Sequence, residues 1–239
     1  MIRKIGILTS GGDSPGMNAA VVSVARCAAM NGIQLMGIKR GYNGLLGLSK
    51  NPEDDICALD LETVLDIADQ RGTFLRTARC VEFKQPEVRR QAAENLRQLG
   101  IDALVVIGGD GSFTGAMYLC ELGIPCVGIP GTIDNDLGYT EATLGYDTAV
   151  NVCVEAVRSI RATSRSHDRP HVVQVMGRNC GDIAMKTAIA TGAEMLVVPE
   201  MEWDVDEVAA RLNHLIEQGN TRATLVISEH CWDNMKPFD

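Results

Sequence analysis

The stretch PGTIDNDLG, residues 130–138, carries polar side chains that could do acid–base or metal chemistry. Asp134 and Asp136 lie two residues apart, with Thr132 before them, directly after the apolar run IPCVGI. If this segment is extended, all three side chains leave the chain on one face. One carboxylate could then accept a proton from a substrate hydroxyl while the other holds a metal ion or water. A turn rich in Asp and Asn, with no chemical role, is the alternative, because such turns are common.

The stretch VIGGDGSFTGA, residues 106–116, places one acid, Asp110, among glycines that include Gly109 and Gly111. Glycine backbone at the start of a helix favours anion binding, because its N–H groups are accessible to a ligand. We expect Ser112 to cap that helix. A carboxylate would repel an anion bound beside it unless a cation lies between the two groups. Magnesium is the usual cation in this position. The loop therefore predicts a site for a magnesium-bound phosphate.

The loop TSGGDSPGMNAA, residues 9–20, also runs from an apolar segment into a helical pattern. Gly11 and Gly16 have the spacing of the glycines of a P-loop, but Met17 and Asn18 stand where that motif needs Lys and Ser or Thr. The loop is therefore not a Walker motif. It could bring backbone N–H groups to a phosphate, or it could be a glycine turn that caps a helix.

Three arginines occur in loop-like segments rather than on helix faces: Arg79 in TARC, Arg169 in SHDRPH and Arg178 in VMGRNCGD. An arginine on a loop can clamp a phosphate with two parallel hydrogen bonds. Surface arginines are more often simply solvated, so each position alone leaves both interpretations open.

Short apolar runs alternate with amphipathic segments and predict the elements that must position these loops. Seven runs read as strands: KIGILT, LMGI, ALVVIG, CVGI, HVVQV, MLVV and TLVIS. Four segments between them read as helices, at residues 17–30, 86–99, 147–164 and 205–218. Strands that are apolar throughout are covered on both faces, which predicts an α/β fold of two doubly wound lobes with mostly parallel sheets. We place the lobes at residues 1–138 and 139–239, and expect the chemistry in loops that follow strands.

The bulk composition limits the partners. The net charge of −9 disfavours binding to nucleic acid or to an anionic membrane. The N-terminal apolar patch is too short for a signal peptide or a membrane span. The eight cysteines form no CxxC pair, so we expect free, mostly buried thiols in a reducing cytoplasm.

Seven segments resemble the phosphofructokinase family and occur in the order found there: TSGGDSPGMNAA, RGTFLRTAR, VIGGDGS, PGTIDND, SRSHDR, VMGRNCGD and ISEH. The resemblance spans essentially the whole chain. It implies a cytoplasmic phosphoryl transfer from a nucleotide to the 1-hydroxyl of fructose 6-phosphate, with magnesium, usually in a homotetramer. This chemistry depends on placement and charge neutralisation, which loop arginines and a metal ion can supply.

The resemblance also implies residue roles, in which Asp134 is the general base and Thr132 and Arg178 complete the catalytic group. It places the donor nucleotide against Gly11, Arg79, Cys80, Gly109, Asp110, Gly111 and Ser112, and the magnesium ion on Asp110. It places the sugar phosphate against Thr132, Asp134, Asp136, Arg169, Met176, Gly177, Arg178 and Glu229, with Arg169 reaching across a subunit interface.

The donor can be read from two glycines. Relatives that use pyrophosphate carry Asp after GGD and Lys after the proline of the TIDND loop. Here these positions are Gly111 and Gly131, which we expect to leave space for a nucleotide, so ATP is favoured. A pyrophosphate-dependent enzyme, another small-molecule kinase and a non-catalytic nucleotide-binding short form are the alternatives.

The chain departs from the family pattern in two places. In the effector pocket of bacterial relatives, Arg26, Arg161 and Glu194 match, whereas Val22 and Leu61 replace arginines. The loss of these cations predicts weaker binding of a phosphorylated effector. The chain also ends at CWDNMKPFD, where the resemblance implies a further GHIQRGG-like segment, so we expect an incomplete second lobe.

Overall fold

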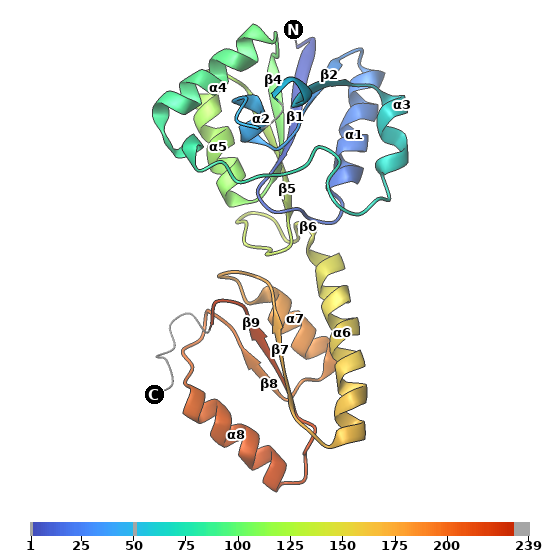
Figure 1. The fold of residues 1–239 in the computed structure, drawn as a ribbon, viewed down its shortest axis with the longest axis vertical. Coiled ribbons are helices and arrows are strands. Elements are labelled where there is room, and N and C mark those ends of the chain that lie inside the picture. The colour runs from blue at the N-terminus through green and yellow to red at the C-terminus, as the bar shows by residue number, and fades with distance from the viewer. Residues whose placement is uncertain (1, 50–51, 232–239) are drawn as a thin grey trace. The chain divides into compact units, whose positions relative to one another are not determined.

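The computed structural model describes residues 2–49 and 52–231. The chain forms two compact units (Figure 1). Unit 1 comprises Met1–Thr132 and Leu137–Gly145, and unit 2 comprises Ile133–Asp136 and Tyr146–Asp239. The sequence suggested a single break after residue 138, whereas the units exchange two short segments around that point. Most of CWDNMKPFD, on which the expectation of a missing segment rests, lies outside the described residues.

Unit 1 is built on a six-stranded sheet with the order β3-β2-β1-β4-β5-β6. Neighbouring strands are parallel except for β2 and β3. The strands are β1 (Lys4–Ser10), β2 (Gln34–Ile38), β3 (Ile56–Leu59), β4 (Ala103–Gly108), β5 (Cys126–Thr132) and β6 (Leu144–Gly145). The central strands β1 and β4 are buried along most of their length, as a sheet with two covered faces requires.

Helices cover both faces of this sheet (Figure 1). One core lies beneath α1 (Met17–Met30) and α3 (Leu61–Val64), and the other beneath α2 (Tyr42–Leu45), α4 (Pro86–Gln98) and α5 (Asp110–Glu121). Three short 3-10 helices, Pro52–Asp54, Leu65–Ile67 and Glu82–Lys84, complete the unit. Pro86 opens α4 at its first turn, where a missing N–H costs nothing.

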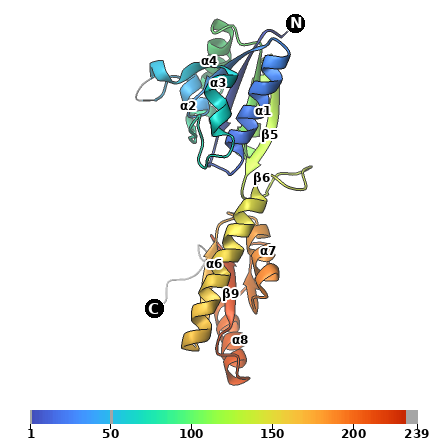
Figure 2. The same cartoon turned by 90° about the vertical axis from the view of Figure 1, so that its right-hand side faces the viewer.

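Unit 2 is a three-stranded parallel sheet with the order β7-β9-β8. Its strands are β7 (His171–Val175), β8 (Met195–Val197) and β9 (Thr224–Ser228). The helices α6 (Tyr146–His167) and α7 (Asp182–Thr191) pack on one core, and α8 (Val205–Glu217) packs on another. Figure 2 shows α6 running along this unit. The carboxylate of Asp204 caps α8 by accepting hydrogen bonds from Asp206 N and Glu207 N.

The α/β class with mostly parallel sheets is confirmed, and the seven predicted strands and four predicted helices are present to within three residues at each end. Two other expectations are corrected. Of the eight free cysteines only Cys231 is buried, while Cys27 and Cys120 are exposed and the rest are half-buried. Ser112 does not cap α5, because Gly109 occupies that position and Ser112 lies inside the first turn.

Candidate functional site

Three loops of unit 1 meet at the carboxyl ends of β1 and β4. The amide of Gly11 donates to Ala78 O at 3.3 Å, and the Thr77 hydroxyl donates to Gly11 O at 2.8 Å. A Cβ on Gly108 would lie 2.6 Å from Ser10 O, so the β1 and β4 ends approach closely only because Gly108 has no side chain. The loop after β1, the 76–80 segment and the start of α5 therefore form one glycine-lined group, which we call the donor-side loops.

The donor-side loops bring together the residues predicted for the nucleotide. Gly11 has a φ of 94°, which favours glycine, and a Cβ there would lie 3.6 Å from Ser112 Oγ. A Cβ on Gly109 would lie 3.5 Å from Thr132 Cβ, so Thr132 also belongs to this group. A Cβ on Gly111 would meet no atom within 4 Å, which leaves open space beside the exposed Asp110.

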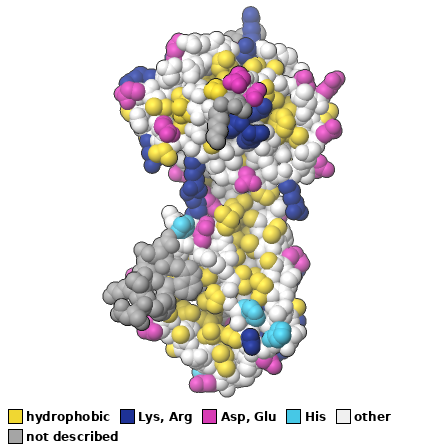
Figure 3. Space-filling model, viewed as in Figure 1, with side chains coloured by type: hydrophobic (Ala, Val, Ile, Leu, Met, Phe, Trp, Pro, Cys, Tyr) yellow, Lys and Arg dark blue, Asp and Glu magenta, His cyan; other side chains and the backbone are white. Residues whose placement is uncertain are grey.

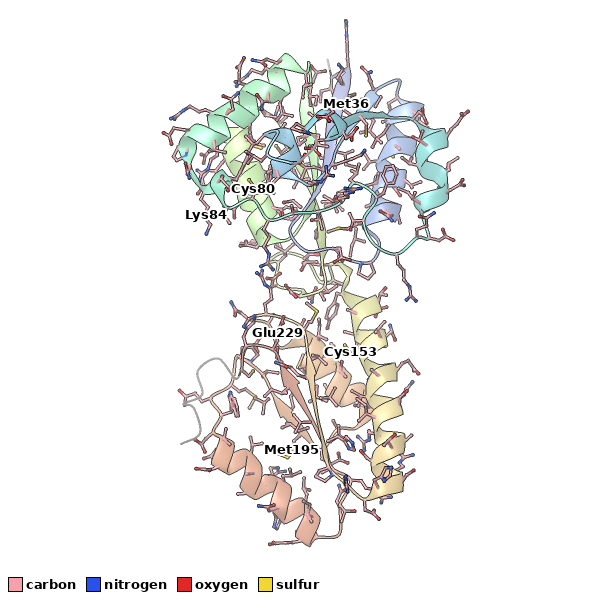
Figure 4. All side chains as sticks on the ribbon, in the orientation of Figure 1. Met36, Cys80, Lys84, Cys153, Met195 and Glu229 are labelled. Carbon is pink, nitrogen blue, oxygen red and sulfur yellow. The ribbon has the colours of Figure 1, made fainter. Side chains whose placement is uncertain are left out.

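Arg79 and Cys80 follow Ala78 in the same segment, and Figure 4 shows Cys80 in unit 1. The Arg79 side chain is exposed, while its carbonyl oxygen accepts from Asn43 Nδ2 at 3.3 Å. Burial raises the pKa of the Cys80 thiol, so this thiol stays protonated near neutral pH. Cys80 can therefore offer packing to a ligand rather than a reactive thiolate.

Tyr42 supports these loops and was not singled out in the sequence. Its buried hydroxyl donates to Ser112 O at 2.7 Å, and its ring stacks on Phe83 with 4.0 Å between centroids. Burial raises the pKa of this phenol well above its usual range, which keeps it a donor. The ring also fills the space beside Gly115, where a Cβ would lie 2.8 Å from it. A lone Tyr in a short helix gives no sequence signal for this role.

The Asp134 segment differs from the expected extended strand. Asn135 has a φ of 55°, so the chain turns there and the alternation of side chains is lost. Thr132 groups with unit 1, whereas Asp134 and Asp136 group with unit 2. Asp134 is buried and Asp136 is exposed. The condition of a fully extended segment, on which a shared face of the three side chains depended, is therefore not met.

Gly131 also has a different role from the one expected. It is buried, and a Cβ there would lie 3.0 Å from Ile107 Cγ2 and 3.3 Å from Met17 Cε. A side chain at this position would enter the core of unit 1 rather than a ligand site. Of the two glycines, only Gly111 therefore leaves open space for a nucleotide.

The loop after β7 carries Met176, Gly177 and Arg178, and a single carboxylate holds it. Glu229 Oε1 accepts from Gly177 N at 3.1 Å and from Arg178 N at 2.9 Å. Glu229 follows β9, the strand next to β7, and Figure 4 shows it at the end of that strand. The φ values of Gly177 (141°) and Arg178 (52°) make the sharp turn that exposes the side chains of Met176 and Arg178.

Two further carboxylates brace the neighbouring turns of unit 2. Asp182 Oδ2 accepts from Asn135 Nδ2 at 2.8 Å, which ties the Asp134 segment to the start of α7. Glu200 Oε1 accepts from Gly181 N at 2.7 Å. Burial, together with the negative charge of Asp182, raises the pKa of Tyr146 to about 12. We call the turns held by Glu229, Asp182 and Glu200 the acceptor-side loops.

Arg169 lies apart from the acceptor-side loops. It precedes the amino end of β7, whereas Arg178 follows the carboxyl end of the same strand. Five residues of strand separate these ends by roughly 17 Å. Within one chain, therefore, the two predicted sugar-phosphate ligands lie at opposite ends of β7.

A polar pocket within unit 2 contains two of the residues that matched the effector site. Arg161 donates to Glu194 at 3.0 Å and to Gly192 O at 2.8 Å, so much of its guanidinium is already engaged. The lining residues are Arg161, Arg165, Glu194, Gln218, Gly219, Asn220 and Arg222. In unit 1, Val22 is part of the core beneath α1. Weak binding of a phosphorylated effector remains our prediction.

In the part of the chain that the structure describes, no helix is both long and apolar enough to span a membrane. The described residues also contain no group of three or more His, Cys, Asp or Glu side chains arranged to hold a metal ion.

The family model for phosphofructokinase matches residues 4–237. ATP-dependent 6-phosphofructokinase 1 of Clostridium perfringens is 50% identical over 228 residues, which cover 95% of this chain and 70% of the relative. The T-state structure of Pichia pastoris phosphofructokinase has a TM-score of 0.84 at 36% identity, over 96% of this chain and 26% of that chain.

A pyrophosphate-dependent phosphofructokinase from Nitrosospira multiformis has a TM-score of 0.76 at 20% identity, over 95% of this chain and 60% of that chain. At this identity the similarity shows the fold alone. The chain thus spans about a quarter of the Pichia chain and somewhat over two thirds of the Clostridium relative. From the match to the family model and from the identity to the Clostridium enzyme, the chain belongs to the phosphofructokinase family.

Proposed function

We propose that this protein transfers the γ-phosphate of ATP to the 1-hydroxyl of fructose 6-phosphate and forms fructose 1,6-bisphosphate. The observation that carries this proposal is the 50% identity, over 95% of the chain, to an ATP-dependent 6-phosphofructokinase. The open space beside Gly111 supports a nucleotide as the donor, because a side chain there would occupy it.

The donor-side loops hold ATP in this proposal. Gly11 and Gly109 allow the backbone to approach the phosphates, and the guanidinium of Arg79 neutralises their charge. Ser112 and Cys80 border the nucleotide. The hydrogen bonds from Thr77 and Tyr42 keep this surface in place before ATP arrives.

Magnesium accompanies the nucleotide, and Asp110 is the residue that would hold it. The fit is reasonable because Asp110 is exposed at the start of α5 beside open space, and one carboxylate suffices when phosphates supply other ligands. When bound, magnesium neutralises the phosphate charge that develops during transfer.

Asp134 acts as the general base that accepts the proton of the sugar 1-hydroxyl. Its buried position directly after β5 supports this role, because a base must be held in place beside the hydroxyl that it deprotonates. Thr132 and Asp136 support the transferring group, and Arg178 stabilises its charge. Met176, Gly177 and Glu229 contact the sugar, with Glu229 also fixing the turn that presents Arg178.

Arg169 binds the 6-phosphate of a sugar held by a neighbouring subunit. The roughly 17 Å of strand between Arg169 and Arg178 supports this assignment, because it places the two arginines at opposite ends of β7. The working form is therefore a homo-oligomer, and we infer a homotetramer in the cytoplasm. The eight free thiols suit such a reducing compartment.

The test is to incubate the purified chain with fructose 6-phosphate, magnesium and either ATP or pyrophosphate, and to measure fructose 1,6-bisphosphate. We expect turnover with ATP and none with pyrophosphate. Turnover with pyrophosphate alone would overturn the donor assignment. ATP binding without turnover would favour a nucleotide-binding subunit instead of an enzyme.

A further inference from the structure

The three residues that link α6 to β7, residues 168–170, are held on both sides of Arg169. Asp168 has a φ of 48°, and its Oδ1 accepts from the Thr221 hydroxyl at 3.0 Å. Pro170 follows, and a residue that precedes proline is restricted to extended conformations. The backbone around Arg169 therefore has little freedom, although the loop lies at the surface.

His171 adds a third restraint. Its amide donates to Ala223 O at 3.0 Å, which anchors the first residue of β7 to the residue that precedes β9. Its Nδ1 contacts the hydroxyl of Ser164, a side chain that is only 1% exposed, and lies 3.1 Å from Arg169 O. A carbonyl oxygen can only accept, so a hydrogen bond to Arg169 requires the proton on Nδ1. With the proton on Nδ1, the Ser164 hydroxyl oxygen accepts from the same N–H.

The backbone around Arg169 is restrained, but its side chain is not. Two arginines of α6 are engaged by carboxylates: Arg161 by Glu194 and Arg158 by Glu155. Among the described residues, the guanidinium of Arg169 forms no hydrogen bond or ion pair. Figure 3 shows histidine and basic side chains together near the end of α6. A fixed backbone that presents an unengaged guanidinium is the arrangement expected of a preorganised anion ligand.

We propose that His171 is a positioning residue for Arg169. Its Nδ1–H holds the Arg169 carbonyl and so aims the guanidinium at a phosphate monoester dianion. This inference rests on the proposed function, because the phosphate is that of the sugar substrate. His171 itself does not touch the substrate, so its effect appears in sugar binding and not in the chemical step.

The kinetic test compares three variants in the ATP-dependent assay. His171→Phe keeps a planar ring but cannot donate, and we expect a KM for fructose 6-phosphate about tenfold higher, as for the loss of one supporting hydrogen bond. The kcat and the KM for ATP should change by less than about twofold. His171→Asn offers an amide N–H where Nδ1 lies and should restore the KM to within about threefold. Gln174→Ala, an exposed position of the same strand, is the control and should leave all values unchanged.

A second readout needs no activity: hydrogen exchange of a peptide that covers residues 165–170. Exchange should become faster in His171→Phe and stay as in the parent for His171→Asn and Gln174→Ala. Parent-like exchange and KM in His171→Phe would overturn the inference. Equal KM increases in the Phe and Asn variants would also overturn it, because a merely structural role predicts no rescue. If the parent shows no turnover, the proposed function fails, and the exchange result alone decides the role of His171.

Discussion

The donor-side loops and the acceptor-side loops are built in different ways. In unit 1, main chain meets main chain: Gly11 N donates to Ala78 O, and Gly108 passes against Ser10 O with no room for a side chain. In unit 2, carboxylates hold the turns by accepting from main-chain amides, as Glu229 does for Gly177 and Arg178.

Because they are built differently, the donor-side and acceptor-side loops should respond differently to substitution. Two backbones can approach closely only while the glycine has no side chain. Even alanine, the smallest replacement, should therefore cause the full loss of stability at such a position. A turn held by a side chain can be weakened in steps, because a carboxylate can be replaced by an amide or removed.

Asp134→Asn removes the proposed base, and we expect kcat to fall by about 10²–10⁴-fold, the range for loss of a general base. The KM for fructose 6-phosphate should change by less than about threefold, because the amide has nearly the same shape. Steady-state kinetics with ATP measures both values. Asp206→Asn, an exposed acid of α8, is the control. A near-normal kcat would refute the assignment of the base.

Glu229→Ala leaves Gly177 N and Arg178 N without their acceptor, and a bond to a charged group contributes about 1.5–3 kcal/mol. We expect the KM for fructose 6-phosphate to rise by about 10–100-fold. Glu229→Gln keeps an oxygen acceptor and should give a smaller increase. Equal effects of the two substitutions would contradict the stepwise response expected of the acceptor-side loops.

Gly108→Ala and Gly111→Ala form a matched pair in one loop. At Gly108 the new Cβ would lie 2.6 Å from Ser10 O, so we expect the free energy of unfolding to fall by about 1–3 kcal/mol. At Gly111 the space is open, so stability should be unchanged or rise by up to about 1 kcal/mol in the first turn of α5. Denaturant unfolding measures both. If Gly111→Ala destabilises the protein more, the contrast between packing and open space fails.

Thr77→Val removes the hydroxyl that donates to Gly11 O at 2.8 Å. A neutral hydrogen bond contributes about 1 kcal/mol, so the KM for ATP should rise by about three- to fivefold. The KM for fructose 6-phosphate should stay constant, since the change lies in the donor-side loops. Thr77→Ser keeps the hydroxyl and should behave as the parent. An effect confined to fructose 6-phosphate would break the division between the two sides.

The strand–helix alternation was predictable because buried strands are apolar throughout and the long helices have one apolar face. Two helices were harder to delimit. The α5 segment contains glycines and small residues, and α7 is apolar on most positions, so neither has a clear periodic pattern. The edge strand β6 has two residues and leaves almost no signal.

The motifs predicted which residues belong to the candidate site, but they did not predict how these residues are oriented. The sequence TIDND does not indicate that Asn135 adopts a φ of 55°. Nor does it indicate that Gly131 faces Ile107 and Met17. These features depend on tertiary neighbours. The same holds for Tyr42, whose role arises from segments 70 residues apart.

The exchange of segments between the two units has a consequence for fragments of this protein. The chain crosses between units after residues 132, 136 and 145, and β6 pairs with β5 from the far side of two crossings. A protease that cuts once after residue 132 would leave residues 137–145 on the wrong fragment, still hydrogen-bonded to unit 1. The nicked halves should therefore co-purify, and a gene that ends at residue 132 would encode a sheet without its last strand.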